Sequence, residues 1–135
     1  MKYGFVKYFY KKKVRRKKRK SLEYLKYKKE TLHMAEEKLL YFNQFYNLKW
    51  NKIFIKNQKT RWGSCSKQGN INFNYRIIFL PQKMADYIIV HELCHLQEFN
   101  HSADFWNLVA KVIPDYKEIR QELRKNGFRF HLYVG

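Results

Sequence analysis

Residues 81–99 constrain the fold most, because they predict a long helix that carries two histidines one turn apart. Pro81 suits a first helical turn, and apolar residues recur after it at helical spacing. An HExxH motif, residues 91–95, lies in the middle of this predicted helix. Four steps of about 100° bring the ring of His95 to within about 40° of the ring of His91, on the same face.

This motif is typical of a metal site. Two neutral imidazoles at this spacing can bind one Zn²⁺ ion, which lowers the pKa of a bound water toward about 7. Glu92 lies about 100° around the helix from His91, where it is placed to take a proton from that water. The alternative is a helix face with hydrogen-bonded histidines, on which Glu92 is an ordinary surface charge.

A catalytic zinc ion needs three protein ligands and an open fourth position. His101 follows six residues after His95, just past the predicted end of the helix, where the chain can fold back. We therefore predict His101 as the third ligand, with Glu98 and Asp104 as the alternatives. Cys65 is a further but less favoured candidate.

Positive charge is concentrated at the N-terminal end of the chain. Of 135 residues, 29 are Lys or Arg and 11 are Asp or Glu, which gives a formal net charge of +18. Residues 1–30 hold 14 basic and 2 acidic side chains, a net charge of +12, whereas residues 31–135 have a net charge of +6. We therefore divide the chain into a basic N-terminal arm, residues 1–20, and one domain, residues 21–135.

The like charges of residues 11–20 predict an arm that is frayed, or helical only on a partner. Such an arm favours non-specific contact with nucleic acid through phosphate neutralisation. Binding to anionic lipid and a purely solubilising role are the alternatives.

Composition excludes several classes of protein. A hydrophobic content of 45% supplies a core and argues against wholesale disorder. No apolar run approaches the roughly 18 residues of a membrane span, and lysines interrupt residues 1–10 too often for a signal peptide. Cys65 and Cys94 form no CxxC pair, and two such cysteines are typical of reduced thiols. We expect a cytoplasmic protein.

Hydrophobic periodicity predicts an α+β fold. The expected helices cover residues 21–47, 81–99, 102–112 and 115–126, the third capped by Ser102 and the last closed by Gly127. The expected strands cover residues 52–56 and 70–79, joined by a turn-rich connection. Residues 128–134 form a short strand or a tail.

Four segments carry a resemblance to a known family. They read TRWGSCS at residues 60–66, GNINFNYR at 69–76, HELCH at 91–95 and NHSADFW at 100–106. In this order they resemble the YgjP-type metallopeptidase domain, which is similar to the SprT-like group of zincins. The likeness covers roughly residues 20–126.

The resemblance implies a zincin-like α+β fold, in which a small sheet packs on the active-site helix with further helices around it. It also implies zinc held by His91, His95 and His101, and Glu92 as the general base. Two features depart from relatives: the β-rich N-terminal region is reduced to about 20 mostly basic residues, and the Cys-rich zinc ribbon of some SprT-like proteins is missing. Some YgjP-like proteins are assigned nucleotide phosphohydrolase activity.

Other residues are assigned to the cleft or its support. The resemblance implies that the strand at residues 70–79 borders the cleft and can pair with an extended substrate. The alternative is an internal strand of the sheet with no free edge. Arg61 and Arg76 stabilise an oxyanion or bind an acidic group, or else brace a turn. Residues 62–65 make a tight turn packed on the active-site helix. Three polar residues could orient the imidazoles: Asn100, Ser102 and Asp104.

The leading prediction is a zinc-dependent metallopeptidase with one Zn²⁺ ion. It hydrolyses peptide bonds of a protein or peptide substrate by metal-activated water, with Glu92 as the general base. The alternatives are a metal-dependent nucleotide or phosphoester hydrolase, favoured by the positive charge, and a non-enzymatic, basic nucleic-acid-binding module.

Overall fold

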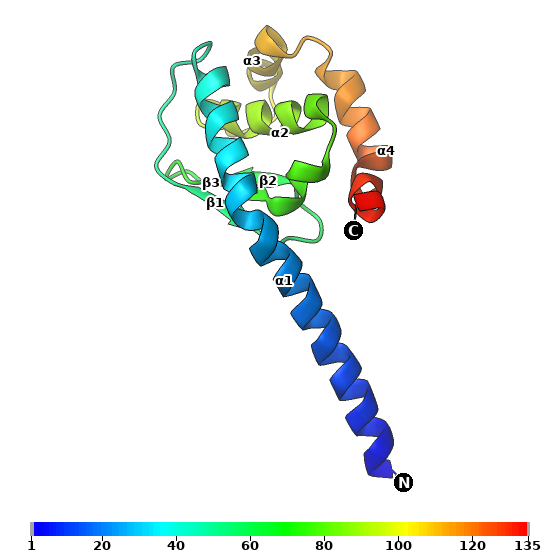
Figure 1. Ribbon diagram of the computed structural model, residues 1–135. Helices are drawn as coiled ribbons and strands as arrows, with labels where there is room; N and C mark the ends of the chain where they lie inside the picture. Colours follow the sequence, from blue (N-terminus) through cyan, green and yellow to red (C-terminus); the bar gives the residue numbers. More distant parts are fainter. Residues whose placement is uncertain (1, 135) are drawn as a thin grey trace.

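The computed structural model describes the backbone of residues 2–134 and the side chains of residues 22–127. In chain order its elements are α1 (Lys2–Asn43), β1 (Ile53–Lys56), β2 (Gly63–Cys65), β3 (Ile71–Asn74), the 3₁₀ helix η1 (Tyr75–Phe79), α2 (Gln82–Cys94), α3 (Ala103–Val112) and α4 (Tyr116–Val134). The fold combines four α-helices with one small sheet, on which α1 and α2 pack (Figure 1). The predicted α+β class is confirmed.

The sheet has three strands in the order β1-β3-β2. Strand β1 runs parallel to β3, and β2 runs antiparallel to it, with Gly63 opposite Phe73 and Cys65 opposite Ile71. The central strand is therefore β3, and β2 is an edge strand. Of the two readings of residues 70–79, the internal strand is correct, and a substrate cannot pair with β3.

The strand at residues 70–79 is also shorter than predicted, because it ends at Asn74. The buried side chain of Asn74 accepts a hydrogen bond from the backbone N–H of Arg76. Its amide nitrogen donates to the carbonyls of Gln58 and Arg61. This local bonding starts the 3₁₀ helix η1, in which Tyr75, Arg76 and Ile77 are all buried.

Strand β2 lies within the segment expected to be only a turn-rich connection. Its three residues include Gly63 and Ser64, which have low strand propensity, and the strand is too short to show an alternating pattern. Pairing with β3 therefore creates this strand, and its own sequence does not predict it. As expected, the segment does pack on the helix that carries the HExxH motif, because β2 contacts α2.

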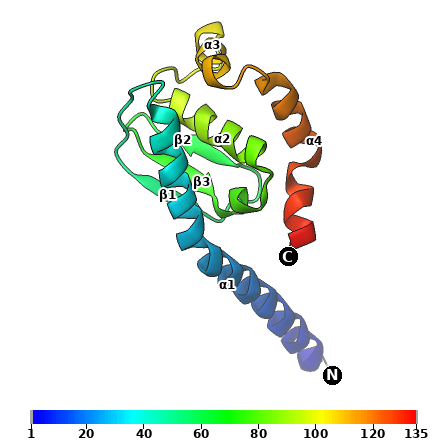
Figure 2. The same cartoon turned by 45° about the horizontal axis from the view of Figure 1, so that its top comes forward.

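Helix α1 begins at Lys2, and its backbone continues without a break through the basic arm. The expectation of a frayed arm is therefore not met, in keeping with the high helix propensity of Lys and Arg. The N-terminal half of α1 projects away from the rest of the chain in both views (Figures 1 and 2). The helix ends four residues earlier than predicted, and Asn47 then adopts a positive φ of 54°.

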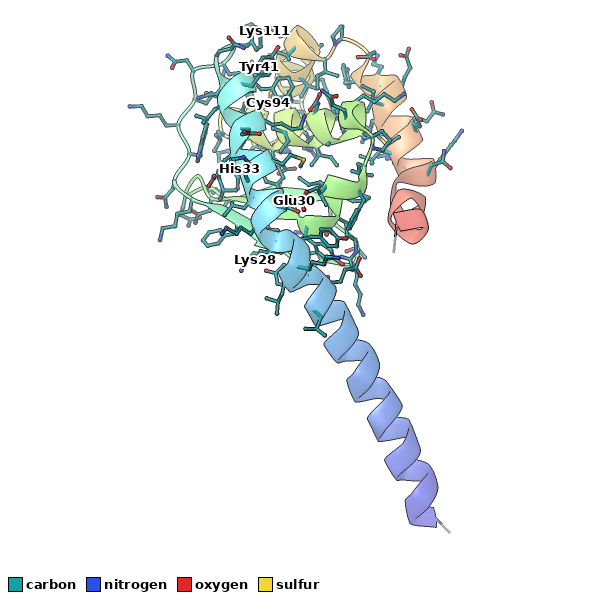
Figure 3. The ribbon with its side chains drawn as sticks, in the orientation of Figure 1. Lys28, Glu30, His33, Tyr41, Cys94 and Lys111 are labelled. Carbon is teal, nitrogen blue, oxygen red and sulfur yellow. The ribbon has the colours of Figure 1, made fainter. Side chains whose placement is uncertain are left out.

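Among the residues with described side chains, the C-terminal half of α1 packs on the body, and Lys28, His33 and Tyr41 lie along this half (Figure 3). Leu39 is fully buried, as are Thr31 and Ala35. Leu22 and Leu25 are about 60% exposed, so the predicted apolar stripe is only partly a core face.

Polar contacts fix this half of α1. The hydroxyl of Thr31 donates to the carbonyl of Tyr75, 3.0 Å away, and the hydroxyl of Tyr24 donates to the carbonyl of Ile55, 2.8 Å away. Lys38 forms an ion pair with Asp86 on α2. The helix is thus tied to η1, β1 and α2.

Helix α2 lies at the centre of the fold, where it contacts α1, β2, α3 and α4. It ends at Cys94, followed by a turn over residues 95–97, so the prediction of a helix up to residue 99 is wrong. The HExxH motif is therefore at the C-terminal end of the helix and not in its middle. His95 is the residue just past that end.

Helix α3 begins as predicted, with the Ser102 hydroxyl accepting a hydrogen bond from the N–H of Phe105. Helix α4 does not end at Gly127, and the expected strand or tail at residues 128–134 is helical instead. A Cβ added to Gly127 would lie 3.2 Å from the ring of Trp62 and 2.9 Å from a methyl of Leu123. This glycine therefore permits close packing of α4 on Trp62. Within the described part of the chain, no helix is long and apolar enough to cross a membrane.

Neighbouring leucines on α1 test this packing. Leu39→Ala should lower the free energy of unfolding by about 2–5 kcal/mol, because it leaves a cavity in the core. The control Leu40→Ala, at a side chain that is 68% exposed, should change it by less than about 0.5 kcal/mol. Urea unfolding followed by circular dichroism measures both, and equal losses would contradict the packing of α1.

Candidate metal centre

Three imidazoles converge at the C-terminal end of α2. The Nε2 atom of His95 lies 3.1 Å from that of His91 and 3.1 Å from that of His101. The Nε2 atoms of His91 and His101 are 3.3 Å apart. The helix places the first two residues, and the turn after it brings His101 back to meet them.

These distances fit a metal ion better than they fit hydrogen bonds. A neutral imidazole has one N–H donor and one acceptor nitrogen, so three mutually facing Nε2 atoms cannot all be paired by hydrogen bonds. Three nitrogens bound tetrahedrally at 2.0–2.1 Å from a zinc ion would be about 3.3–3.4 Å apart. The donor set of His91, His95 and His101 therefore fits a zinc ion.

The imidazoles are held in the neutral form that can bind a metal. Burial lowers the pKa of His91 to about 3, and His95, His101 and Arg120 lower it further by their charge. Burial also lowers the pKa of His95, although the carbonyl of Glu98 opposes this shift. The pKa of His101 is lowered by burial and by Arg120.

Hydrogen bonds orient two of the rings. Nδ1 of His95 lies 2.9 Å from the carbonyl oxygen of Glu98, and Nδ1 of His91 lies 3.3 Å from the hydroxyl of Tyr87. Both contacts leave Nε2 free to point at the cluster. Among the described residues, no hydrogen bond joins these rings to the three polar residues predicted to orient them, which were Asn100, Ser102 and Asp104.

Aromatic packing fixes the rings from the α3 side. The buried ring of Phe105 stacks on His95 at 4.4 Å between centroids, with an angle of 17° between the planes. Trp106 stacks on His101 at 5.6 Å and 25°. Tyr87, Phe105 and Trp106 were not predicted to belong to the site. Phe105 and Trp106 do lie in the segment at residues 100–106 that carries the family resemblance.

Glu92 lies beside the cluster in a tightly packed position. Its side chain is only 7% exposed, and one carboxylate oxygen lies 3.7 Å from Nε2 of His91. The other oxygen has no hydrogen-bond partner among the described residues. A Cβ added to Gly63 on β2 would lie 2.9 Å from Cγ of Glu92. The glycine in β2 is therefore what allows the carboxylate to fit.

Burial raises the pKa of Glu92 to about 8, and the charge of Arg61 opposes this shift. Positive charge next to Glu92, from Arg61 or from a bound cation, favours the carboxylate form. A buried carboxylate with an unpaired oxygen beside three imidazoles can accept a proton in this site.

The other candidate ligands lie outside the cluster. Glu98 contributes only its backbone carbonyl, and within the described residues neither Asp104 nor Cys65 joins the group of metal-ligating atoms. Burial, with the charge of Glu92, raises the pKa of the Cys65 thiol to about 11, which disfavours the thiolate that zinc would bind.

The cluster opens into a cavity of about 320 Å³ that strand β2 borders. Arg61, Gly63 and Cys65 line it together with His91 and His101. Arg76 does not reach it: its guanidinium donates to the side chains of Asn57 and Asn74 and to the carbonyl of Gln58, so it braces a turn.

A family model described as a YgjP-like metallopeptidase domain matches residues 4–126. The chain belongs to the YgjP-like metallopeptidase family. The resemblance inferred from the sequence is thereby confirmed. Comparison with curated protein sequences gave no match.

Two solved structures resemble the YgjP-like chain. One is the metallopeptidase zymogen abylysin of Pyrococcus abyssi, with 28% identity and a TM-score of 0.60 over 67% of this chain and 93% of the other. The second is the metallopeptidase zymogen jannalysin of Methanocaldococcus jannaschii, with 26% identity and a TM-score of 0.55 over 70% of this chain and 94% of the other. The predicted zincin-like architecture of this YgjP-like chain is therefore confirmed.

The hydroxyl of Tyr87 can be tested as a support for the cluster. Tyr87→Phe should weaken zinc binding by about tenfold, because it removes the polar contact to Nδ1 of His91. The control Tyr24→Phe removes a hydroxyl that bonds to Ile55 on β1 and should leave zinc affinity unchanged. Competition with a chelating dye measures both affinities; equal values for Tyr87→Phe and the unchanged protein would refute this role.

Proposed function

We propose that this YgjP-like domain is a zinc-dependent metallopeptidase whose metal is held by His91, His95 and His101. The observation that carries the proposal is the approach of three Nε2 atoms to within 3.1–3.3 Å of one another beside the buried carboxylate of Glu92. Family membership and likeness to two metallopeptidase zymogens support the reaction class.

A zinc ion in this site would supply a Lewis acid that polarises water and the carbonyl of the scissile peptide bond. Glu92 then accepts a proton as water attacks the carbonyl carbon, and passes it to the leaving nitrogen. Its burial next to Gly63 keeps this proton within the site. Arg61 adds positive charge near the carboxylate and near the carbonyl oxygen.

Strand β2 offers a way to position the peptide. It is the edge strand next to the cluster, and its residues line the cavity into which the imidazoles face. An extended peptide could add to this edge through main-chain hydrogen bonds, as in other strand-addition complexes. The role assigned to residues 70–79 in the sequence thus moves to β2.

Zinc content and turnover separate metal binding from catalysis. Purified protein should contain about one zinc ion per chain, and His95→Ala should lose most of it, because one of three ligands is gone. Glu92→Gln should keep its zinc and lose at least about 100-fold in the rate of casein or peptide hydrolysis, because the proton acceptor is gone.

The same preparations should be offered nucleoside triphosphates in parallel. If neither the unchanged protein nor His95→Ala contains zinc, the metal site is rejected. If the unchanged protein hydrolyses nucleotides but no peptide, and Glu92→Gln loses that activity, the proposed function changes from peptidase to phosphohydrolase.

Gly63 tests the fit of the carboxylate. In Gly63→Ala the new methyl group would lie 2.9 Å from Cγ of Glu92 and 3.0 Å from the carbonyl oxygen of Asn72, so the carboxylate must move. Turnover should fall by about 100-fold with zinc still bound, since small misplacements of catalytic groups have effects of that size.

Gly69→Ala is the control, because that residue has a φ of +82° and lies beside Asn51, away from the cluster. It should reduce stability by about 1 kcal/mol through backbone strain and leave zinc-dependent turnover intact. Full activity in Gly63→Ala would show that the contact with Glu92 is unimportant.

A further inference from the structure

A second cavity adjoins the cluster and shares Arg61, Gly63, His91 and Glu92 with the first. It has a volume of about 340 Å³, at the lower end of the range for small-ligand sites of about 300–1,000 Å³. His91 and Glu92 form part of its wall, so it adjoins the reacting atoms directly. Its apolar lining includes Trp62, which directly precedes β2, Ile88 on α2 and Leu123 on α4.

Three guanidinium groups surround this space, which we call the arginine cavity. Arg61 precedes β2, while Arg120 and Arg124 are one turn apart on α4. In the described part of the chain no ion pair joins any of the three to a carboxylate. Glu122 on α4 pairs instead with Lys83, 3.0 Å away.

Arg120 is fixed in place before any ligand binds. Its guanidinium carbon lies 5.0 Å from the ring centroid of Trp106. Trp106 in turn stacks on Tyr116 at 4.9 Å, with only 9° between the planes, and on His101. The positive group is thereby packed against the same aromatic ring that supports the metal cluster, which reduces the entropy lost when it binds a partner.

We propose that the arginine cavity binds a carboxylate of the peptide substrate, belonging to a residue next to the scissile bond. This inference rests on the proposed peptidase function and names its substrate class. Guanidinium groups match carboxylates with paired, charge-assisted hydrogen bonds, and the apolar lining suits the methylene stem of such a residue. The carboxylate comes either from a Glu or Asp side chain or from the C-terminus of the peptide.

Binding can be measured without turnover, using full-length, zinc-loaded Glu92→Gln protein and fluorescently labelled short peptides. Two peptides blocked at both ends differ only in Glu or Gln at one position, and each position is tried in turn. At low salt the best Glu peptide should bind about tenfold more tightly than its Gln partner. A third peptide, with Gln and a free C-terminal carboxylate, distinguishes the terminus from the side chain as the source.

Single substitutions on α4 connect this preference to the cavity. Arg124→Gln should reduce the Glu-to-Gln ratio to about threefold or less, and Arg124→Lys should restore part of it, because the charge returns without the planar fork. Lys125→Gln is the matched control: it removes one positive charge from the neighbouring exposed residue, which does not line the cavity, and should leave the ratio unchanged.

The outcomes separate this inference from the function on which it rests. Equal binding of Glu, Gln and free-acid peptides, or a ratio that Arg124→Gln and Lys125→Gln affect alike, overturns the carboxylate site. If the unsubstituted enzyme then still cleaves neutral peptides, the peptidase function stands alone. A tenfold preference in a protein that cleaves no peptide supports the cavity and rejects the peptidase. Displacement of the peptides by a nucleoside triphosphate that the enzyme hydrolyses rejects both.

Discussion

The removal of His91 and Glu92 from water is the constraint on which the site depends. Helix α2 carries these two ionisable side chains into the interior, where it contacts α1, α3, α4 and β2. Burial disfavours charge on both, and it shifts their pKa values in opposite directions, down for the imidazole and up for the carboxylate. The result is a neutral ring able to bind a metal next to a carboxylate with high proton affinity.

The surrounding residues leave space for the buried Glu92 carboxylate and pack against the imidazole rings. Gly63 gives the carboxylate of Glu92 its space, and Phe105 and Trp106 cover the rings from the α3 side. Arg61 supplies the positive charge that opposes neutralisation of Glu92. Two further arginines on α4 leave one side of the cluster electropositive, and this asymmetry underlies the preference we propose for acidic peptides.

Much of this arrangement could be predicted because it depends on local spacing. The HExxH motif fixed the relation of His91 to His95, and Ser102 marked the start of α3. Packing of residues 62–65 on α2 was expected, but the individual contacts between distant segments could not be predicted. Nothing local indicates that Gly63 meets Glu92, that residues 63–65 pair with β3, or that Arg120 on α4 reaches Trp106 on α3.

Three of the errors have a common physical origin, because packing between distant segments decided the outcome. The strand at residues 70–79 ends at Asn74 because the buried amide of that residue bonds to carbonyls from another segment. Gly127 looked like a helix end, but its small size serves packing against Trp62. Leu22 and Leu25 continue the apolar stripe of α1 beyond the point where the body can cover it.

The central claim is that three imidazoles, and no thiolate, hold a zinc ion beside Glu92. X-ray absorption at the zinc edge of the purified protein tests it most directly. We expect nitrogen and oxygen neighbours at about 2.0–2.1 Å, with the multiple-scattering signature of three imidazole rings. A sulfur neighbour at about 2.3 Å, or zinc surrounded by fewer than two imidazoles, would contradict the account.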